Sequence, residues 1–502
     1  MREKMKKITN LFVRFIVITL VATLLLTFIS CSLPDASELH NQQQAAHMHE
    51  SDGTHEDDSI VTPSNIFEPE YVEQIVNPDR SLFYGETITI ATWNPHFLNG
   101  VAVRYMEANP GVTINIINHR DSSWIFADGF DFSEPRLEIA TQLMAGSAPT
   151  LIAAELADPF DMRQAVYFYD WYLLMDADPN FNEDEWFMNV FHGFSKNDRL
   201  FHFPIFSNYN VITANTTISD LQDTIDEKPD GATIMDLVEI HRDFSVDYPE
   251  FYLEEYFATE MILEYEIGRF VDIETGRVDF GEEFIDLITY AKSTTCPDYS
   301  HRWRNLSHNA MTDLRKSTRY LFHFRNTMYY HHFVDYEGER PFVGMTPLVN
   351  DYGELLLDSR LSVSYLLNAN ATPIEKAIAW DFIMFLMEYE NQIDTDLQAV
   401  LLLSPNRNTF ENNARSLLPG RIRMVTWFRG SDDDAIDAID GIVETMFEFH
   451  EMPMRVTRVL PNTINEVIEN AIQQFHDGLL SAEQTAELLQ NQITLVLMEM
   501  ER

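Results

Sequence analysis

The sequence contains few cysteines and few basic residues, and each shortage excludes a class of protein. Two cysteines among 502 residues cannot build a disulfide scaffold, and no C-x-x-C motif of a metal or redox site occurs. Only 34 lysines and arginines stand against 80 acidic residues, which gives a formal net charge of -46. Because phosphate binding needs a basic surface, this charge argues against nucleic acid as a partner. It also argues against electrostatic adhesion to an anionic membrane, and it is typical of an exposed extracellular surface.

Sequence motifs of common enzymes and metal sites are missing as well. G-x-S-x-G, H-E-x-x-H and the Walker A sequence do not occur, so we predict no catalytic residue and no cofactor. The paired carboxylates of a glycosidase are defined in space, so a chain with 80 acids leaves that chemistry open. "DADPNFNEDEW" resembles an EF-hand loop, but Phe181 and Phe187 stand where glycine and a bidentate glutamate belong. We therefore expect an acidic turn before a helix there, and no metal site.

The first 31 residues have the parts of a secretory signal. A basic start is followed by an apolar run at 15–29, which is shorter than the about 20 residues of a membrane-spanning helix. Ser30-Cys31 resembles the bacterial lipobox, in which cleavage exposes the cysteine and its sulfur receives a diacylglycerol; Phe28 stands where leucine is usual. We predict a signal peptide at 1–30 and a lipid on Cys31 that anchors the chain at the extracellular face of the bacterial membrane. A plain transmembrane anchor and a secreted protein are the alternatives.

Residues 31–83 are polar and show no periodicity, which predicts a disordered tether. Histidines within it leave metal collection open as an alternative to a plain linker. These are His40, His47, His49 and His55. The second cysteine, Cys296, is interpreted as an unpaired thiol.

From Thr87 onward the pattern is that of an α/β protein. "TITIATW", "VTINII" and "TLIAA" read as strands, and two helical segments, near 97–108 and 135–145, separate them. Strands and helices that alternate at this spacing predict a right-handed parallel unit. Ligands of such sheets bind beyond the carboxyl ends of the strands. Trp93, directly after the first strand, is therefore placed where a ligand is expected.

Several segments from Thr87 to the C-terminus resemble the extracellular solute-binding proteins of ABC importers, the sugar-binding branch especially. These are "TITIATWNPHFLNGVAVRYMEANPGVTINI", "QLMAGSAPTLIAA", "DRLFHFPIFSNYNVITANTTI", "TIMDLVEIHRDF", "PIEKAIAWDFIMFLMEYENQ" and the last two helices. Thr150 replaces an aspartate that is usual in that family. The residues alone also indicate helices, since Thr372, Pro373 and Glu375 form a capping box and Trp380 falls within the helix that follows, where we expect it in the core.

The resemblance implies a two-lobed α/β fold of type II, whose lobes are each interrupted and are joined by a hinge. We assign 84–208 and 346–410 to lobe 1, and 209–345 and 411–502 to lobe 2. Hinge motion is expected to close the cleft between the lobes on a ligand.

Sugars need flat aromatic groups for their CH faces and polar side chains for their hydroxyls, which guides the choice of candidate residues. The alternatives are packing roles: core for Trp93, lobe-edge packing for Trp124, hinge packing for Tyr209 and Asn210 at the crossing between lobes, and surface packing for Trp303 and Arg304. The predicted ligand-binding residues are Trp93, Asn94, Trp124, Glu155, Tyr209, Asn210, Trp303 and Arg304.

We therefore expect a monomeric binding lipoprotein that captures a small solute, a sugar or oligosaccharide first, and delivers it to ABC permease subunits. No enzymatic activity is expected. Two alternatives remain: an extracellular polysaccharide-active enzyme, and a sensor or adaptor lipoprotein that uses the same cleft.

Overall fold

The computed structural model describes most of the chain from residue 69 to residue 500. The exceptions are 94–95, 120–132, 158–164, 216–217, 219, 229, 250, 255–257, 274, 295–319, 327–341, 358–362, 389, 392–403, 425–431 and 458–459. Residues 64–502 form one compact unit, and it contains two separate sheets, each with its own buried core.

The first sheet has the strand order β2-β1-β3-β12-β4. Its parallel part is β1 (Thr87–Thr92) between β2 (Thr113–Asn118) and β3 (Leu151–Ala153). The helices α4 (His96–Ala108) and α5 (Ser133–Met144) connect these strands, which confirms the predicted alternation. β12 (Val363–Leu367) then pairs antiparallel with both β3 and β4 (Phe203–Phe206).

The second sheet has the order β10-β5-β9-β6. β5 (Asn210–Asn215) lies between β9 (Tyr320–Asn326) and β10 (Phe342–Pro347) and is antiparallel to both, while β6 (Tyr252–Glu254) is parallel to β9. Two-stranded pairs add β11 (Leu355–Leu357) with β13 (Met454–Val456), and β7 (Val271–Asp272) with β8 (Arg277–Val278).

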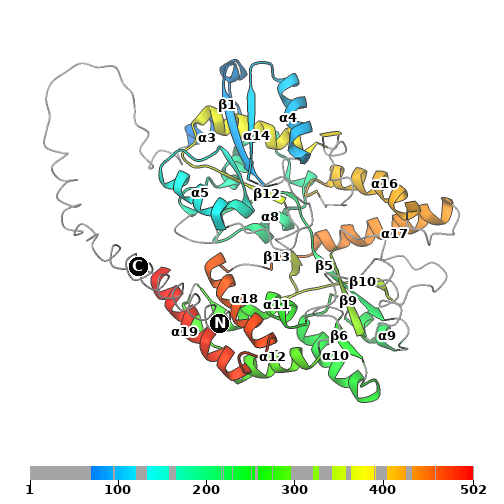
Figure 1. Ribbon diagram of the computed structural model, residues 1–502. Helices are drawn as coiled ribbons and strands as arrows, with labels where there is room; N and C mark the ends of the chain where they lie inside the picture. The colour runs from blue at the N-terminus through cyan, green and yellow to red at the C-terminus, as the bar shows by residue number, and fades with distance from the viewer. Residues whose placement is uncertain are drawn as a thin grey trace, which may run out of the picture. The chain divides into compact units, whose positions relative to one another are not determined.

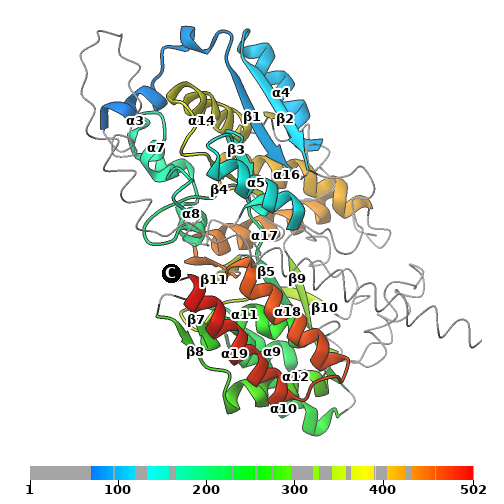
Figure 2. The same cartoon turned by 60° about the vertical axis from the view of Figure 1, so that its left-hand side comes forward.

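Helices cover both sheets, as Figures 1 and 2 show. α14 (Pro373–Met387) packs against β1 and α4 of the first sheet, and α3 (Pro69–Val76) lies beside α14. α18 (Asn462–His476) and α19 (Ala482–Met500) run side by side over the second lobe. The remaining helices are η2 (Arg80–Phe83), η3 (Ala154–Leu156), α7 (Trp171–Ala177), η4 (Glu183–Glu185), α8 (Met188–Phe194), α9 (Leu221–Asp226), α10 (Ile234–Asp247), α11 (Ala258–Phe270), α12 (Glu282–Thr294), α16 (Arg407–Met424) and α17 (Asp432–Glu451).

The capping signals that the sequence shows are present. The Thr372 side chain accepts from the Glu375 amide, and the Glu375 carboxylate accepts from the Thr372 amide. Pro373 follows as the first helical residue, where its missing N–H costs nothing. Trp380 of the same helix is only 3% exposed, as predicted for a core residue.

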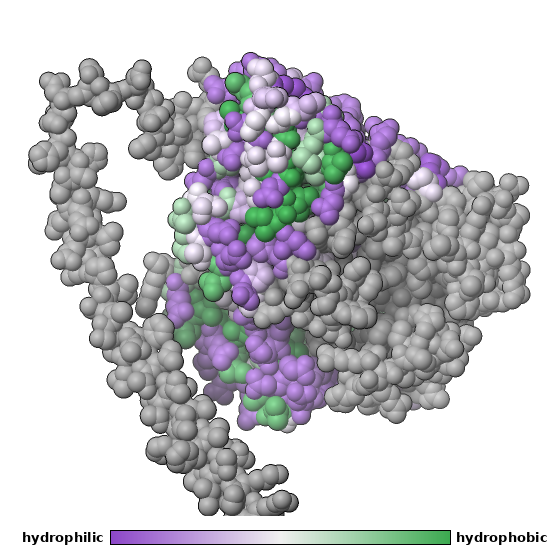
Figure 3. Space-filling view, turned by 45° about the horizontal axis from the view of Figure 1, so that its top comes forward, coloured by the Kyte–Doolittle hydropathy of each residue, from purple (hydrophilic) through white to green (hydrophobic). Residues whose placement is uncertain are grey.

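Two hydrophobic cores define the lobes. The first is built around β1, β3, β12 and α14, and it includes Met446 and Phe449 of α17. The second is built around β5, α10, α12, α18 and α19. The lobe boundaries expected from the sequence stay a prediction. They assign α17 to lobe 2, whereas α17 contributes side chains to the first core. Figure 3 shows that hydrophilic side chains cover most of one face of the described residues.

Among the described residues, no helix is both long and apolar enough to span a membrane. The same residues contain no group of three or more histidine, cysteine, aspartate or glutamate side chains placed to hold a metal ion. In the acidic segment that resembles an EF-hand loop, Asp178 instead accepts from the backbone N–H of Asn180 at 2.9 Å.

Candidate functional site

Two of the predicted residues meet at the carboxyl end of the first sheet. Trp93 directly follows β1, and Glu155 lies in η3, directly after β3. Because β1 and β3 are neighbours in the sheet, the two side chains come together, and the Trp93 side chain hydrogen-bonds the Glu155 carboxylate. The Trp93 ring is partly buried and packs against the first core. A flat apolar surface and a carboxyl group thus stand side by side where parallel sheets bind ligands.

Glu155 has an unusual environment for a carboxyl group. The residue as a whole is partly exposed, but its Oε2 is buried and has no hydrogen-bond partner within the part of the chain that the structure describes. Burial raises the pKa of Glu155 to about 7. Three smaller effects lower this pKa: a hydrogen bond from the backbone of Glu155 itself, the hydrogen bond with Trp93 and the charge of Arg136. The carboxyl group is therefore balanced between its charged and neutral forms near neutral pH.

Arg136 holds the segment that carries Glu155. Its Nε, on α5, donates to the Glu155 backbone oxygen at 2.9 Å. The guanidinium is thereby fixed close to the carboxylate, where its charge favours the ionised form. Arg136 was not among the predicted residues, although it lies in the helical segment predicted near 135–145.

Tyr365 is a second residue that the sequence did not reveal. It comes from β12, is 1% exposed, and lies close enough to Glu155 for the carboxylate charge to affect it. Burial raises the Tyr365 pKa above its usual range, the nearby Glu155 charge adds to this, and a hydrogen bond with Thr92 opposes it. No local motif marks Tyr365, because antiparallel pairing of β12 with β3 brings it to the site from more than 200 positions away along the chain.

Tyr209 and Asn210 lie where the chain passes from the first sheet to the second. Tyr209 is fully buried, and its ring contacts those of Phe449 and His450 with centroids 5.9 and 5.4 Å apart. Asn210 begins β5, and its Nδ2 donates to the Tyr265 hydroxyl at 2.5 Å. These contacts agree with the hinge-packing alternative, and a ligand role for both residues stays a prediction.

The other predicted residues fall outside the described part of the chain. They are Cys31, Asn94, Trp124, Trp303 and Arg304. The tether histidines and Cys296 fall outside it too.

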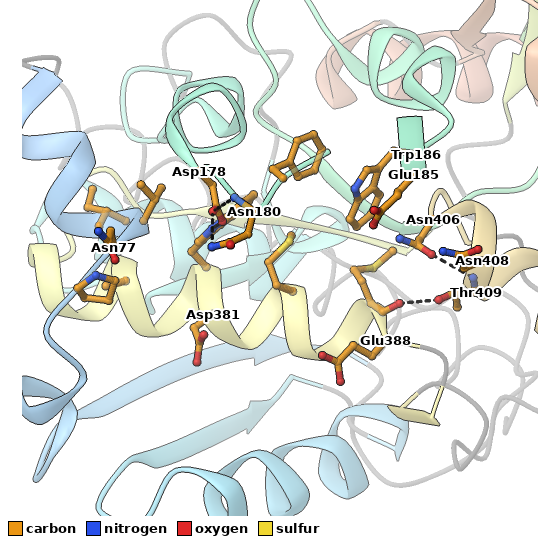
Figure 4. A pocket seen from close by; sticks show the side chains of 18 of the residues that line it. Asn77, Asp178, Asn180, Glu185, Trp186, Asp381, Glu388, Asn406, Asn408 and Thr409 are labelled. Atoms are coloured by element: carbon orange, nitrogen blue, oxygen red, sulfur yellow. Dashed lines mark hydrogen bonds between the residues drawn. The ribbon is translucent and has the colours of Figure 1, made fainter. Parts of the chain in front are cut away.

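A cavity of about 660 Å³ lies elsewhere in the first lobe, along α14, and Figure 4 shows its lining from close by. Neither Trp93 nor Glu155 lines it. The cavity is therefore distinct from the site at the ends of β1 and β3.

Solved structures share this fold at low sequence identity. The sugar-binding protein MalE from the phytopathogen Xanthomonas citri matches with a TM-score of 0.54 and 12% identity, over 83% of this chain and 98% of that chain. A periplasmic oligogalacturonide binding protein from Yersinia enterocolitica matches with a TM-score of 0.50 and 13% identity, over 83% and 100%. A de novo designed esterase matches with a TM-score of 0.51 and 14% identity, over 83% and 100%. No protein-family model and no curated protein matches the sequence.

These similarities concern architecture. The two sheets, their separate cores and the crossing segments between them form the two-lobed α/β fold of periplasmic binding proteins, which confirms the predicted fold class. At identities this low, the ligand has to be argued from the residues of this chain.

Proposed function

We propose that this chain is the solute-binding component of an ABC importer and that it captures an extracellular carbohydrate between its two lobes. The observation that carries the proposal is the contact between Trp93 and Glu155 at the carboxyl ends of two neighbouring parallel strands. The fold supports it, since the structures that share this fold include a sugar-binding and an oligogalacturonide-binding protein.

The chemistry of the pair suits a sugar. The weakly apolar CH face of a pyranose packs on an indole ring, and its hydroxyl groups donate to carboxylate oxygens. Glu155 Oε2 is an acceptor without a partner among the described residues, but it is buried, so a ligand hydroxyl reaches it only when the surrounding side chains move aside. A hydroxyl bound there removes the cost of leaving a buried polar atom without a hydrogen bond. Trp93 fixes the other side of the carboxyl group, so the acceptor is oriented before the ligand arrives.

Capture depends on movement of one lobe against the other. The chain passes from the first sheet to the second between β4 and β5, returns between β10 and β12, and crosses a third time between α17 and α18. The isolated bridge of Tyr209 with Leu357 joins the first two of these crossings. A ligand that contacts both lobes favours the closed form by its difference in affinity for the two forms, and that form is the one a permease would recognise. Within this proposal the partners are two permease subunits, the chain is a monomer, and the lipid on Cys31 keeps it at the outer face of the membrane.

A thermal-shift screen of the full chain with mono- and oligosaccharides tests the function. A ligand that binds only the folded form at 100 times its Kd adds about 2.7 kcal/mol of stability and raises the Tm by several degrees. Trp93→Ala is expected to abolish the shift, and Tyr352→Ala, which removes an aromatic ring that is 83% exposed, is expected to keep it. An unchanged shift in Trp93→Ala would remove Trp93 from the site, and no shift with any carbohydrate would refute the choice of ligand class.

One observation favours a second candidate function, a polysaccharide-active enzyme. A carboxyl group with a pKa near 7 in a partly apolar site is what a glycosidase uses as a general acid. Incubation with oligosaccharides followed by chromatography separates the two candidates, because a binding protein returns its ligand intact whereas an enzyme leaves shorter products. Products that disappear in Glu155→Gln would establish the enzyme.

A further inference from the structure

The cavity beside α14 has the dimensions of a ligand site. Its volume of about 660 Å³ lies within the range of small-molecule pockets. Four segments line it: the end of α3 with the start of η2, the stretch from Asp178 through η4 to Trp186, one side of α14 with the residues just after it, and the start of α16 with Asn406 before it. Ala377 and Met387, both in the lining, are ten residues apart on α14, so the lining extends along about 15 Å of that helix. A ligand longer than one sugar ring fits this length.

Side-chain amides are concentrated in the lining. Asn408 and Asn412 stand four residues apart on α16, so they share one face of that helix. Both are exposed, as is Asn77, and none of the three makes a side-chain hydrogen bond within the described part of the chain. Each amide offers two donors and an acceptor. The complete set of lining asparagines is Asn77, Asn180, Asn406, Asn408 and Asn412.

Aromatic rings provide an apolar wall. Phe181 and Trp186 are stacked with centroids 5.1 Å apart and planes 20° apart, and both line the cavity. Trp380, which also lines the cavity, donates from its indole nitrogen to Asp178 Oδ2 at 2.7 Å. Asp178 also accepts from the Asn180 side chain at 3.2 Å, as the dashed lines in Figure 4 mark. Packing therefore holds the wall in one orientation.

The lining excludes two kinds of ligand. Five carboxylates against one arginine repel an anion, and the N-terminus of α16 is already capped by Asn406, whose Oδ1 accepts from the Thr409 amide at 3.0 Å. The number of polar side chains excludes a purely apolar ligand. Asp381 is paired with Arg80 at 2.5 Å and accepts from the Tyr105 hydroxyl at 2.8 Å, so its charge is compensated within the protein. A cation and a neutral ligand with many hydroxyl groups remain, and the exposed amides favour the neutral ligand because each offers both donors and an acceptor.

We propose that this cavity is a second carbohydrate site, separate from the cleft, which holds a short oligosaccharide between the amides of α16 and the Phe181–Trp186 wall. Asn408 and Asn412 bind hydroxyl groups at one end, and the Asp178–Asn180 pair binds them at the other. The site goes beyond the proposed capture function, because it lies entirely within one lobe and needs no lobe closure. The second site binds one part of a glycan chain while the cleft binds an end of the same chain.

Hydrogen exchange measured by mass spectrometry on the full chain tests the site. The probes are maltotriose, cellotriose and xylotriose at millimolar concentration, with spermidine as a cationic probe. We expect at least one trisaccharide to slow exchange in peptides that cover 404–416 as well as in peptides that cover 87–93 and 151–157. The double variant Asn408→Ala/Asn412→Ala is expected to weaken protection of 404–416 by about tenfold in ligand concentration, because it removes two hydrogen-bonding groups. Asn491→Ala, an exposed asparagine on α19, is the matched control and is expected to keep both effects.

The variants distinguish failure of this site from failure of the proposed function. Trp93→Ala is expected to lose protection in the strand peptides and to keep it at 404–416. Protection of the strand peptides alone would overturn the second site and leave the capture function standing. Protection of 404–416 that survives in Asn408→Ala/Asn412→Ala would overturn it as well, and so would protection there by spermidine alone. Absence of protection in both regions with every trisaccharide would overturn both proposals.

Discussion

His450 should make the stability of this protein depend on pH in a predictable window. Its side chain, near the end of α17, has no exposed surface and lies between the rings of Phe187 and Phe410, with centroids 4.5 and 4.9 Å away. Burial lowers its pKa to about 4, although its hydrogen bond to the Met446 carbonyl oxygen and the nearby Glu451 charge act in the opposite direction. The folded protein therefore keeps this histidine neutral where the unfolded chain does not.

The sign and the size of the effect follow from linkage. In the unfolded chain His450 takes up a proton below about pH 6.5, whereas in the folded chain it stays neutral down to about pH 4. The free energy of unfolding therefore falls as the pH drops through this window. Each pH unit within the window costs about 1.4 kcal/mol, and the step from pH 7.5 to pH 5.0 crosses about 1.5 units of it. The loss assigned to His450 is therefore about 2 kcal/mol.

Urea denaturation at the two pH values measures this loss, and His450→Asn isolates it. Asparagine keeps a donor near the Met446 carbonyl oxygen but does not titrate. The variant is expected to be less stable than the wild type at pH 7.5, and its deficit is expected to shrink by about 2 kcal/mol at pH 5.0. His202, whose pKa burial lowers to about 3, contributes equally to both proteins and cancels. His192→Asn, at an exposed position of α8, serves as the control. A deficit of the same size at both pH values would refute the reasoning.

Two further predictions concern the cleft and a helix cap. The charged form of Glu155 is the stronger acceptor and its pKa is about 7, so carbohydrate affinity is expected to rise up to about tenfold from pH 6 to pH 8. Glu155→Gln is expected to flatten this pH profile. Calorimetric titration at the two pH values measures the affinity, and a steep profile in the variant would contradict the prediction. Thr372→Ala removes the side-chain oxygen that caps α14 and is expected to cost about 1 kcal/mol of unfolding free energy in urea denaturation, while an unchanged midpoint would show that the cap contributes nothing.

Features that depend on neighbouring residues could be predicted from the sequence. The alternation of strands and helices from β1 to β3 and the capping box of α14 are local patterns, and the structure contains both. β12 is different, because its antiparallel place between β3 and β4 depends on pairing with residues about 160 to 215 positions earlier. Nothing in the sequence near Tyr365 indicates which strands it will join.

The same distinction explains the candidate sites. Trp93 and Glu155 could be found because the carboxyl end of a parallel strand is both visible in the sequence and a common place for ligands. Tyr365 could not, since it reaches Glu155 only through long-range pairing. The cavity beside α14 could not either, because its walls come from four segments and each of them reads alone as an ordinary turn or helix surface.

The two ends of the described chain belong to different lobes. α3 buries Val72, Ile75 and Val76 in the first core, and α19 buries Leu489, Ile493 and Leu497 in the second. A fluorescent donor attached before α3 and an acceptor attached after α19 would therefore each move with one lobe. Energy transfer between the two labels would measure the change in distance between the lobes when a ligand binds, and it would need no substitution near the ligand.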